Sequence, residues 1–500
     1  MTRVPRAAAR VLREVSRSFD LLGLDAGVTV VVGFSGGPDS LCLLWALSTL
    51  RRLGQGPCPV AVHVDHQLRV DSARDAAQAV ALAHGLGVAL EVEQVDVTVW
   101  PEYRLEGTEA AARAARYAAL GRAALRHQAA AIAIGHTRDD QAETVLLRLL
   151  RGASLEGLAG MRPVSRRRVR LDPADHVGTE CTVVRPLLGL GRAEVHACLS
   201  CLGLTPLEDP SNREPQYRRN RIRHQVIPLL EEIAPGSTHV IARVATLLQD
   251  DADYLEDQAS RYVGELVRCE GSVCRIDRVR LALLPAALQR RVLLTSMLRA
   301  SRDRWHPPAE RLEALRMAAN RASVGRRIEL GNGWLALVEY DAVAIGRSAE
   351  LETVLRLSSG LPLLKPGARV ELGDRAEIPL GNGWRLSCQH RVPGRWVLRT
   401  RRPGDRLIPE SGRPPIRLQD WLVNRKVPAY LRDWLPLLAD DGTVWWVAGV
   451  MGTSFDHPHS LIQVELVRQP SGHGVASDEE RGCGWHRSDD WQSSSVSIGC

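Results

Sequence analysis

The chain has 500 residues, which is too long for one compact domain and predicts about three. Its apolar fraction of 45% and charged fraction of 25% are typical of globular proteins and exclude a wholly disordered or fibrous chain, and no apolar run is long enough to cross a membrane. The net charge of +7 is a weak sign of a polyanionic partner, because many proteins with such a charge bind nothing anionic.

The first 235 or so residues alternate between strand-like and helix-like segments. Short apolar or β-branched runs predict strands at residues 28–32, 59–64, 88–95, 130–134 and 182–184. Longer stretches between them, at residues 41–52, 71–85, 108–129 and 139–150, have helical spacing. This alternation predicts an α/β fold, a doubly wound parallel sheet of the Rossmann-like kind, in a first domain of residues 1–235. Ligands of such sheets bind beyond the carboxyl ends of the strands.

The rest of the chain is expected to form two further domains and a tail. Residues 236–357 should be a mainly helical substrate-binding domain that ends in a β-hairpin, with 236–325 almost entirely helical, and residues 358–468 a small α+β domain. The sequence L-G-N-G-W occurs at Leu330–Trp334 and again at Leu380–Trp384, and each Asn-Gly pair is a strong hairpin signal. Residues 469–500 lack periodicity and are expected to be disordered.

The 10 cysteines are too sparse and too irregular for a disulfide framework, which favours a reduced, cytoplasmic location. Cys198 and Cys201 lie in an apolar helical stretch without convincing further partners, so core packing is favoured over metal binding. Cys269 and Cys274 flank a Glu-Gly turn, and we interpret them in the same way, as core filler.

A glycine-rich segment directly follows the first expected strand and precedes a helix. Backbone N–H groups of such a turn, together with a helix N-terminus, form a cradle for phosphate. The segment lacks the lysine of a Walker A loop and the spacing of a G-x-G-x-x-G fingerprint. Asp39 is the candidate for holding Mg²⁺ against the phosphates. The residues expected to bind the nucleotide are Ser35, Gly36, Gly37, Pro38, Asp39 and Ser40.

This segment resembles the PP-loop of the N-type ATP pyrophosphatases, which adenylate a substrate and release pyrophosphate. Three further motifs resemble one member of that superfamily, the tRNA(Ile)-lysidine synthetase family. They are H-V-D-H-Q-L-R from His63 to Arg69, G-H-T-R-D-D-Q-A-E-T from Gly135 to Thr144, and E-D-P-S-N from Glu208 to Asn212 followed by R-N-R-I-R from Arg219 to Arg223. Similarity resumes at residues 397–450, and the combination is highly specific. The resemblance implies that residues 1–235 form the ATP-pyrophosphatase catalytic domain, that residues 236–357 bind substrate and that residues 358–468 bind tRNA.

The resemblance implies an enzyme that ligates L-lysine to C2 of the wobble cytidine in the CAU anticodon of tRNA(Ile), using ATP and Mg²⁺. The cytidine would first be adenylated, and the lysine amine would then displace AMP. The partners would be this tRNA and L-lysine, without a membrane, and whether the chain forms a homodimer stays open. Two alternatives remain: a tRNA thiolation enzyme on the same scaffold with a cluster on Cys198 and Cys201, and an RNA-binding adaptor without turnover.

Acidic residues gather at the end of the fourth expected strand. If a helix begins near Thr137, then His136, Asp140 and Glu143 share one face at the mouth of the sheet. Two carboxylates there can bind an amine or a metal, or transfer protons, although an isolated motif of this kind is more often a solvated helix start. We interpret Asp140 and Glu143 as the lysine-recognising pair, Asp139 as a secondary candidate and His136 as a catalytic neighbour.

His63, Asp65 and His66 follow the second expected strand. Two histidines and one aspartate at this spacing rarely complete a tetrahedral metal site in a strand-end loop. We therefore expect them to shape the adenine and ribose side of the nucleotide site, with His63 and Asp65 as ATP-binding residues.

Arginines supply the remaining candidates. Arg219 and Arg223 lie four residues apart and should project from one helical face, where guanidinium groups suit a transferring phosphoryl group or an RNA phosphate, and Arg219 is the expected catalytic residue. Two other clusters are candidate tRNA contacts, whereas Trp445 and Trp446 are expected in the core. The clusters are a segment expected to be a loop, with Arg162, Arg166, Arg167, Arg168 and Arg170, and a C-terminal set of Arg399, Arg401, Arg402, Arg406, Arg413, Arg417 and Arg425.

Overall fold

The computed structural model describes residues 5–67, 72–105, 107–175, 177–207, 218–301, 305, 307–321, 324–373, 375–390, 396–409, 414–440, 442–457 and 462–468. They form two compact units, one up to Tyr254 and one from Leu255 onward. The expected domain boundaries stay predictions. The 469–500 tail, Leu68, Arg69, Glu208–Asn212 and Arg413 lie outside the described residues. No helix in the described part of the chain is long and apolar enough to span a membrane.

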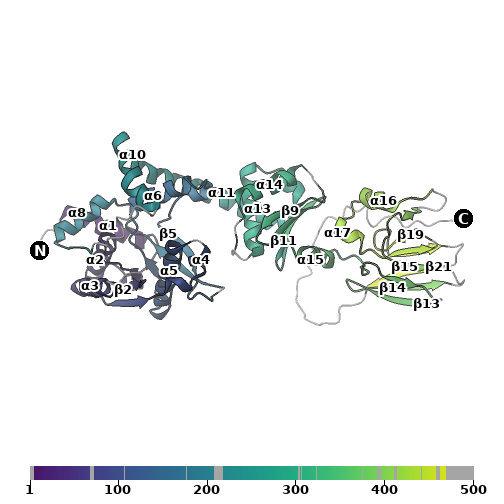
Figure 1. Ribbon diagram of the computed structural model, residues 1–500, viewed down its shortest axis with the longest axis horizontal. Coiled ribbons are helices and arrows are strands. Elements are labelled where there is room, and N and C mark those ends of the chain that lie inside the picture. The colour runs from purple at the N-terminus through teal and green to yellow at the C-terminus, as the bar shows by residue number, and fades with distance from the viewer. Residues whose placement is uncertain are drawn as a thin grey trace. The chain divides into compact units, whose positions relative to one another are not determined.

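A six-stranded sheet forms the centre of the first unit, in the order β3-β2-β1-β4-β6-β5. Figure 1 labels β2 and β5 of this sheet among the helices of the first unit. The strands are β1 (Thr29–Gly33), β2 (Cys58–Asp65), β3 (Leu90–Gln94), β4 (Ala131–Ala133), β5 (Val164–Val169) and β6 (Thr179–Val184). All neighbours pair in parallel except β5 with β6. The five predicted strands and the doubly wound α/β class are therefore confirmed.

The antiparallel strand β5 corrects one prediction, because its arginine-rich segment was expected to be a loop. The run from Arg166 to Arg168 pairs residue by residue with β6. Since β5 is an edge strand, its charged side chains can reach solvent, and charges at an edge also disfavour pairing with another chain. An edge strand of this composition lacks the apolar run by which strands are found.

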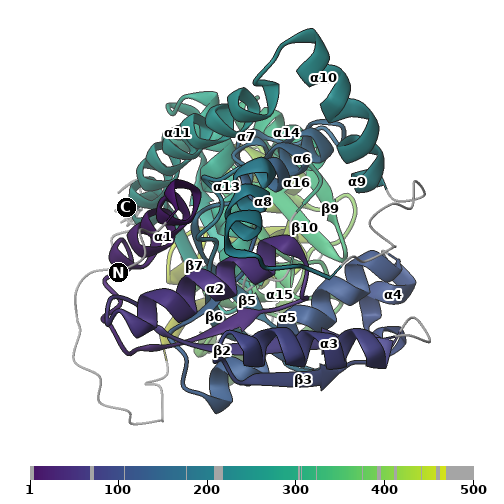
Figure 2. The same cartoon turned by 90° about the vertical axis from the view of Figure 1, so that its left-hand side faces the viewer.

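Helices cover both faces of this sheet. Along β1, Val30 and Val32 point into the core under α1 (Arg6–Asp20), α2 (Pro38–Arg52) and α8 (Arg192–Leu202), while Val31 points into the core under α5 (Thr108–Arg126). Figure 2 shows α1, α2 and α8 side by side, with α3 (Ser72–Gly85) further along the sheet. The strand order reverses between β1 and β4, so the loops after these two strands flank the crevice where such folds bind ligands.

The second unit begins with a five-stranded antiparallel sheet in the order β7-β8-β11-β10-β9. Its strands are β7 (Val267–Glu270), β8 (Val273–Asp277), β9 (Arg327–Gly331), β10 (Trp334–Val338) and β11 (Ala342–Arg347). One face packs on α13 (Ala286–Ser301) and α14 (Ala309–Asn320), and the other on α15 (Leu351–Ser358). The long helix α11 (Ser237–Leu266) and the short α12 (Arg278–Ala282) flank the β7–β8 hairpin. This hairpin interrupts a region that was expected to be almost entirely helical.

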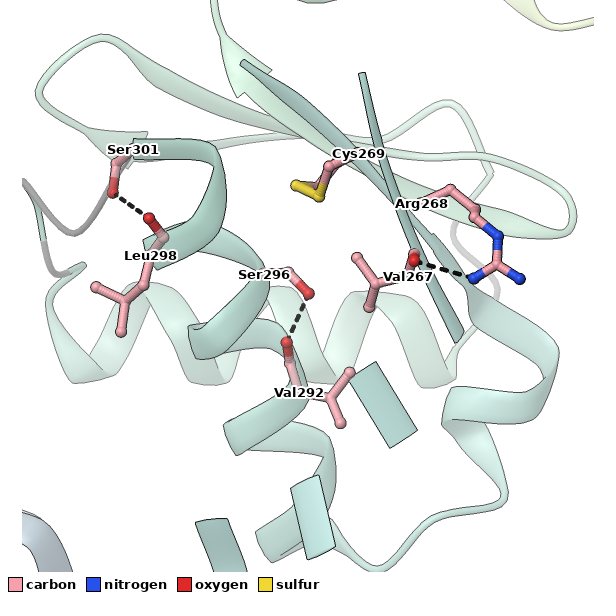
Figure 3. The surroundings of a disulfide bond; sticks show 8 residues. Val267, Arg268, Cys269, Val292, Ser296, Leu298 and Ser301 are labelled. Carbon is pink, nitrogen blue, oxygen red and sulfur yellow. Dashed lines mark hydrogen bonds between the residues drawn. A yellow bond between two sulfur atoms is a disulfide. The ribbon is translucent and has the colours of Figure 1, made fainter. Parts of the chain in front are cut away.

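The β7–β8 hairpin also corrects the interpretation of two cysteines. Cys269 and Cys274 lie directly opposite each other in the ladder and form a disulfide, with their Cα atoms 4.0 Å apart (Figure 3). The core interpretation is therefore right for the position of Cys274, which is fully buried, and wrong for Cys269, which is exposed, and neither cysteine is a free thiol. The turn after Glu270, with Gly271 at a φ of +59°, brings the two residues into register, and side chains opposed across two strands share a face.

The C-terminal part of the second unit holds two sheets and two short helices. Six strands pair in the order β12-β15-β18-β19-β16-β17: β12 (Arg369–Glu371), β15 (Val397–Arg399), β16 (Arg406–Leu407), β17 (Ile416–Arg417), β18 (Leu437–Asp440) and β19 (Thr443–Val447). Four pair in the order β13-β14-β21-β20: β13 (Arg375–Leu380), β14 (Trp384–His390), β20 (Ser454–His457) and β21 (Ile462–Arg468). The helices are α16 (Leu418–Asn424) and α17 (Ala429–Arg432).

Both L-G-N-G-W repeats form the predicted hairpins, β9–β10 and β13–β14. Asn332 and Gly333 have φ of 50° and 74°, and Asn382 and Gly383 have 59° and 73°. Two consecutive left-handed residues are the requirement of the tight turn that matches the twist of paired strands, and asparagine followed by glycine meets it at low cost.

The aromatic and basic residues of this part separate into core and surface. Trp446 is fully buried and Trp445 packs against the same core, as predicted. The prediction that Arg399 faces tRNA is wrong: its side chain is buried and bonds both carboxylate oxygens of Asp405, at 2.7 and 2.8 Å. A buried guanidinium needs such a partner, because an unpaired charge in the core would be very costly. Arg402, Arg406, Arg417 and Arg425 are exposed, and their contact with RNA stays a prediction.

Candidate active site

The loop after β1 forms a compact cradle at the N-terminus of α2. Ser40 Oγ accepts a hydrogen bond from the Ser35 backbone N–H at 3.2 Å and donates to the Gly37 carbonyl at 3.0 Å. Gly37 caps α2 and Pro38 follows in its first turn. Gly36 has a φ of +78°, and a Cβ there would lie 2.5 Å from Leu207 Cδ1, so no larger residue fits. The free N–H groups at the start of α2 therefore face an anion-binding space.

Asp39 lies in the first turn of α2 beside this cradle. Its Oδ1 is buried and has no hydrogen-bond partner among the described residues. Burial, and then the charge of Asp140, raise the pKa of Asp39 to about 7. A buried carboxylate oxygen without a partner next to a phosphate cradle fits a Mg²⁺ ligand, because Mg²⁺ commonly takes one or two carboxylates and completes its shell with phosphate oxygens and water. The described residues include no group of three or more His, Cys, Asp or Glu that could hold a metal by themselves.

The loop after β4 lies tightly against the PP-loop side of the sheet. A Cβ on Gly135 would lie 2.9 Å from the carbonyl oxygen of Asp39 and 3.1 Å from the backbone nitrogen of Ser40. Only glycine allows this approach, since both neighbouring atoms belong to the backbone. The acidic helix that follows is thereby held next to the phosphate cradle.

Helix α6 (Arg138–Leu149) carries the acidic pair, and it begins where the sequence predicted. Asp140 Oδ2 accepts hydrogen bonds from the backbone N–H and the hydroxyl of Thr137, at 2.9 and 3.0 Å, so one carboxylate oxygen caps the helix. The other oxygen, Oδ1, is left for the site. Glu143 is fully buried one turn later. Asp139 instead accepts a hydrogen bond from the Arg192 backbone N–H at 2.9 Å and so caps α8.

Three arginines surround the two carboxylates. Arg192 reaches Asp140 at 2.7 Å and Glu143 at 2.9 Å from the start of α8. Arg219 reaches Glu143 at 2.8 Å and Asp140 at 3.1 Å, from α9 (Arg218–Arg221). Arg223, in the π-helical turn Ile222–Val226, reaches Glu143 at 2.7 Å and Asp140 at 3.2 Å. The prediction that Arg219 and Arg223 share one face is confirmed. Two carboxylates thus meet three guanidinium groups.

These arginines keep the acids ionised. Burial alone would raise the pKa of Asp140, but Arg192 and Arg219 outweigh it and hold that pKa well below its ordinary value. Burial acts in the same direction on Glu143, and there the hydrogen bond from Arg223 and the charge of Arg192 again lower the pKa. Both carboxylates therefore stay ionised, and the three guanidinium groups around them more than balance their charge.

Two histidines near the strand ends, His66 and His136, have lowered pKa values. Burial lowers the pKa of His136 to about 3 and that of His66 to about 4, and Arg116 acts in the same direction on both. His63 Nδ1 lies 3.0 Å from the Phe34 carbonyl, so it supports the loop after β1. Asp65 Oδ1 accepts from the Gln67 backbone N–H at 2.9 Å. Both residues lie at the end of β2, next to the phosphate cradle, and their contact with ATP stays a prediction.

Sequence reasoning missed two arginines of the site. Arg192 follows β6, whose neighbour in the sheet is β4, so its place could have been inferred only from the strand order. Arg116, on α5, has a buried Nε with no hydrogen-bond partner in the described part of the chain. Its charge acts on His66 and His136, which places it at the same edge of the sheet. A regular helical spacing gave no sign that Arg116 differs from its neighbours.

Of the two cysteines that a thiolation enzyme would use, only Cys198 lies in the core of the first unit, so the prediction of core packing is confirmed for Cys198 and wrong for Cys201. Cys198 is fully buried, and its thiol is hydrogen-bonded to that of Cys42. Cys201 is exposed, and its thiol donates to the Cys198 carbonyl at 3.0 Å.

Two family models and several proteins of one name match this chain. A family model described as a PP-loop domain matches residues 9–230, and one described as the TilS substrate C-terminal domain matches residues 397–461. A tRNA(Ile)-lysidine synthase of Symbiobacterium thermophilum is 35% identical over 483 residues, covering 90% of this chain and 96% of that protein. The enzyme of the same name from Thermobifida fusca is 43% identical over 298 residues, covering 59% of this chain and 83% of that protein.

Among solved structures, a U34-tRNA thiolase of Methanococcus maripaludis with an iron–sulfur cluster matches with a TM-score of 0.40 and 19% identity. The match covers 49% of this chain and 80% of that chain.

Proposed function

The chain belongs to the tRNA(Ile)-lysidine synthase family, and we propose that it ligates L-lysine to C2 of the wobble cytidine in the CAU anticodon of tRNA(Ile). In the first step the cytidine O2 attacks the α-phosphate of ATP, an O–P bond forms, and pyrophosphate leaves. In the second step the side-chain ammonium of lysine loses a proton to water, and the free amine attacks C2. The C2–O2 bond breaks, AMP leaves with that oxygen, and a second proton passes from the nitrogen to water. Adenylation turns a poor leaving group into a good one.

The loop from Ser35 to Ser40 holds the ATP phosphates. Its backbone N–H groups and the N-terminus of α2 supply partial positive charge where the pyrophosphate departs. His63 and Asp65 lie at the end of β2, which pairs with β1, and they border the nucleoside side of this site. Asp39 would hold Mg²⁺ through its carboxylate, whose Oδ1 has no partner among the described residues, and the metal would offset negative charge on the phosphates.

Asp140 and Glu143 bind the side-chain ammonium of lysine. Both carboxylates are ionised and buried. The end of the lysine side chain carries an ammonium, which is the group that such carboxylates can bind. Because Arg219 and Arg223 already occupy these carboxylates, lysine must take over some of their contacts. A released guanidinium is then available for the α-phosphate, where charge develops during adenylation.

The observation that carries this proposal is the adjacency of the two sites. Gly135 holds the acidic helix against the backbone of Asp39, so an amine bound at Glu143 and a phosphate bound at the loop share one space. A two-step reaction that passes an adenylated base from ATP to an amine requires this arrangement.

The test is an assay with purified protein, ATP, Mg²⁺, radiolabelled lysine and a panel of tRNAs. We expect label in the tRNA(Ile) that has a CAU anticodon, with one AMP and one pyrophosphate formed for each lysine attached. AMP formation without lysine attachment to any tRNA, or sulfur transfer to the tRNA, would contradict the proposal.

A further inference from the structure

Four arginines cluster on the face of the first unit that α5 covers. Arg167, on β5, lies with its guanidinium carbon 4.0 Å from the ring centre of Tyr117 on α5. Arg113, also on α5, contributes charge to each of the other three. We call this cluster the arginine platform; its members are Arg113, Arg148, Arg167 and Arg185.

No described carboxylate pairs with the platform. Arg185 donates to the Arg162 carbonyl at 2.7 Å and to the Ser165 hydroxyl at 3.0 Å, and Arg148 donates to the carbonyls of Gly157 and Gly160, both at 2.9 Å. These acceptors are neutral. Burial first, and then the other arginines, lower the pKa of Arg148, whereas no acid raises it. A group of cations held together against their mutual repulsion is what an anion-binding site requires.

Other arginines between residues 162 and 170 lie next to carboxylates. Arg162 is bound to Asp253 at 2.6 Å, Arg166 lies 3.4 Å from Glu180, and Arg170 is bound to Glu102. Only some of the arginines between residues 162 and 170 are therefore available for an external anion, and Arg167 is one of them. The strand alternation of β5 causes this division, because Arg166 and Arg168 point away from the face on which Arg167 meets Tyr117.

The platform is continuous with the active site. Arg116 lies on α5 one turn from Arg113, and its charge interacts with Arg113, Arg167 and, on the other side, Arg219. The N-terminal half of α5 belongs to the carboxyl edge of the parallel strands, where the PP-loop and the acidic helix also lie. Arginines thus extend from the acidic pair out to the exposed side chain of Arg113.

We propose that the arginine platform binds the backbone phosphates of RNA next to the nucleotide that enters the active site. This inference rests on the proposed function, and it names the surface that holds the RNA strand while its base reacts. Guanidinium groups suit phosphodiesters because their donors match the phosphate oxygens. The contacts carry no base specificity, so they position the strand and leave base recognition to the active site.

ATP phosphates are the other ligands that guanidinium groups would bind, and the place of the platform in the sheet argues against them. Arg167 lies on the edge strand β5, whereas the phosphate cradle follows β1, and β4 and β6 lie between these two strands. The platform is therefore assigned to RNA phosphates and the cradle to ATP phosphates.

The experiment measures RNA affinity by fluorescence anisotropy with a labelled anticodon stem-loop, and ATP affinity separately by calorimetry. Arg113→Gln and Arg167→Gln should each weaken RNA binding about tenfold, and the double variant should reduce the slope of log affinity against log salt by roughly 0.7 for each lost phosphate contact. ATP affinity should stay unchanged, and turnover should recover at saturating RNA, so KM rises while kcat is kept. Arg167→Lys should retain most of the binding, because it keeps the charge.

Arg126→Gln is the matched control, since it removes a charge from the last residue of α5, where Arg126 is paired with Glu91 and Glu93. It should change RNA affinity by less than about twofold. Normal RNA affinity and salt dependence in the double variant would overturn the inference, and a loss of ATP affinity instead would assign the platform to the nucleotide. If the wild-type protein bound RNA through the platform but attached no lysine, the proposed function would fail while this inference stood.

Discussion

Arg219 Nε donates a hydrogen bond to Glu143 Oε2 at 2.8 Å, so the arginine expected to meet phosphate holds the carboxylate expected to meet lysine. In the proposed mechanism each member of this ion pair binds a different substrate. Lysine bound at Glu143 would take a partner from Arg219, which would then be available for the phosphoryl group. The geometry thus links amine binding to charge stabilisation at the α-phosphate.

Glu143→Gln should slow lysine transfer more than cytidine adenylation. The substitution keeps the shape of the side chain but removes the charge that attracts the ammonium, so lysine attachment should fall at least about tenfold more than pyrophosphate release. Both steps are measured in one reaction, with labelled lysine and a pyrophosphate assay. The free energy of unfolding should fall by about 2 kcal/mol, because three partly exposed arginines lose one of two carboxylates.

Glu93→Gln is the control for that variant, because Glu93 also binds two arginines, Arg122 at 2.8 Å and Arg126 at 2.6 Å. It lies on β3, at the edge of the sheet away from β4, so the ratio of the two steps should not change. Equal loss of both steps in Glu143→Gln would remove the basis for assigning the acidic pair to lysine.

Gly135→Ala should impair ATP use without unfolding the protein. The new Cβ would lie 2.9 Å from the Asp39 carbonyl oxygen and 3.0 Å from its carbon, and neither backbone atom can move away as a flexible side chain would. The loop after β1 must shift, which displaces Asp39 and the cradle. We expect the KM for ATP to rise at least about tenfold, since small displacements of phosphate ligands are costly.

Gly85→Ala is the matching control for that experiment. Gly85 ends α3, and a Cβ there would meet no atom within 4 Å. The KM for ATP of Gly85→Ala should equal that of the wild type. A normal KM for ATP in Gly135→Ala, with an unchanged melting temperature, would show that the two loops do not depend on their close approach.

The disulfide should stabilise the second unit only under oxidising conditions. It closes a loop of about six residues, for which loss of chain entropy in the unfolded state predicts about 2 kcal/mol. Reducing agent should therefore lower the unfolding midpoint of the wild type, and Cys269→Ser combined with Cys274→Ala should lower it without further response to the agent. Cys388→Ala, at a buried free cysteine of the same unit, should keep the wild-type response. An unchanged wild-type midpoint under reduction would contradict the prediction.

The sequence predicted what local patterns determine. The strand runs, the glycine-rich turn after β1 and the helix start at Thr137 are all short-range signals, and the structure confirms each of them. Arg192 could not be predicted, because its role depends on β6 lying next to β4. Strand β5 was missed because an edge strand needs no apolar run, and the disulfide because cysteine pairing depends on hairpin register.

Asp39→Asn should affect stability in a pH-dependent way. Burial raises the pKa of Asp39 to about 7 from its ordinary 3.8, so ionising it costs free energy in the folded protein. That cost is absent below about pH 4, where the carboxyl group is protonated in both states, grows as the pH rises, and is complete above about pH 7. Without Mg²⁺, the variant should melt at a higher temperature than the wild type at pH 8, and the difference should vanish near pH 4.

The same raised pKa predicts how the enzyme uses Mg²⁺. The metal binds the ionised carboxylate, so protons compete with it below about pH 7, and the half-saturating Mg²⁺ concentration for pyrophosphate release should rise about tenfold for each pH unit below that value. Above pH 7.5 it should be constant. The measurement is a Mg²⁺ titration at fixed ATP between pH 5.5 and 8.5, corrected for Mg²⁺ binding to ATP itself. If the half-saturating Mg²⁺ concentration did not change across this range, Asp39 would not be the residue that holds the metal. If Asp39→Asn kept some activity and its raised Mg²⁺ requirement were the same at every pH, that result would support the role of Asp39.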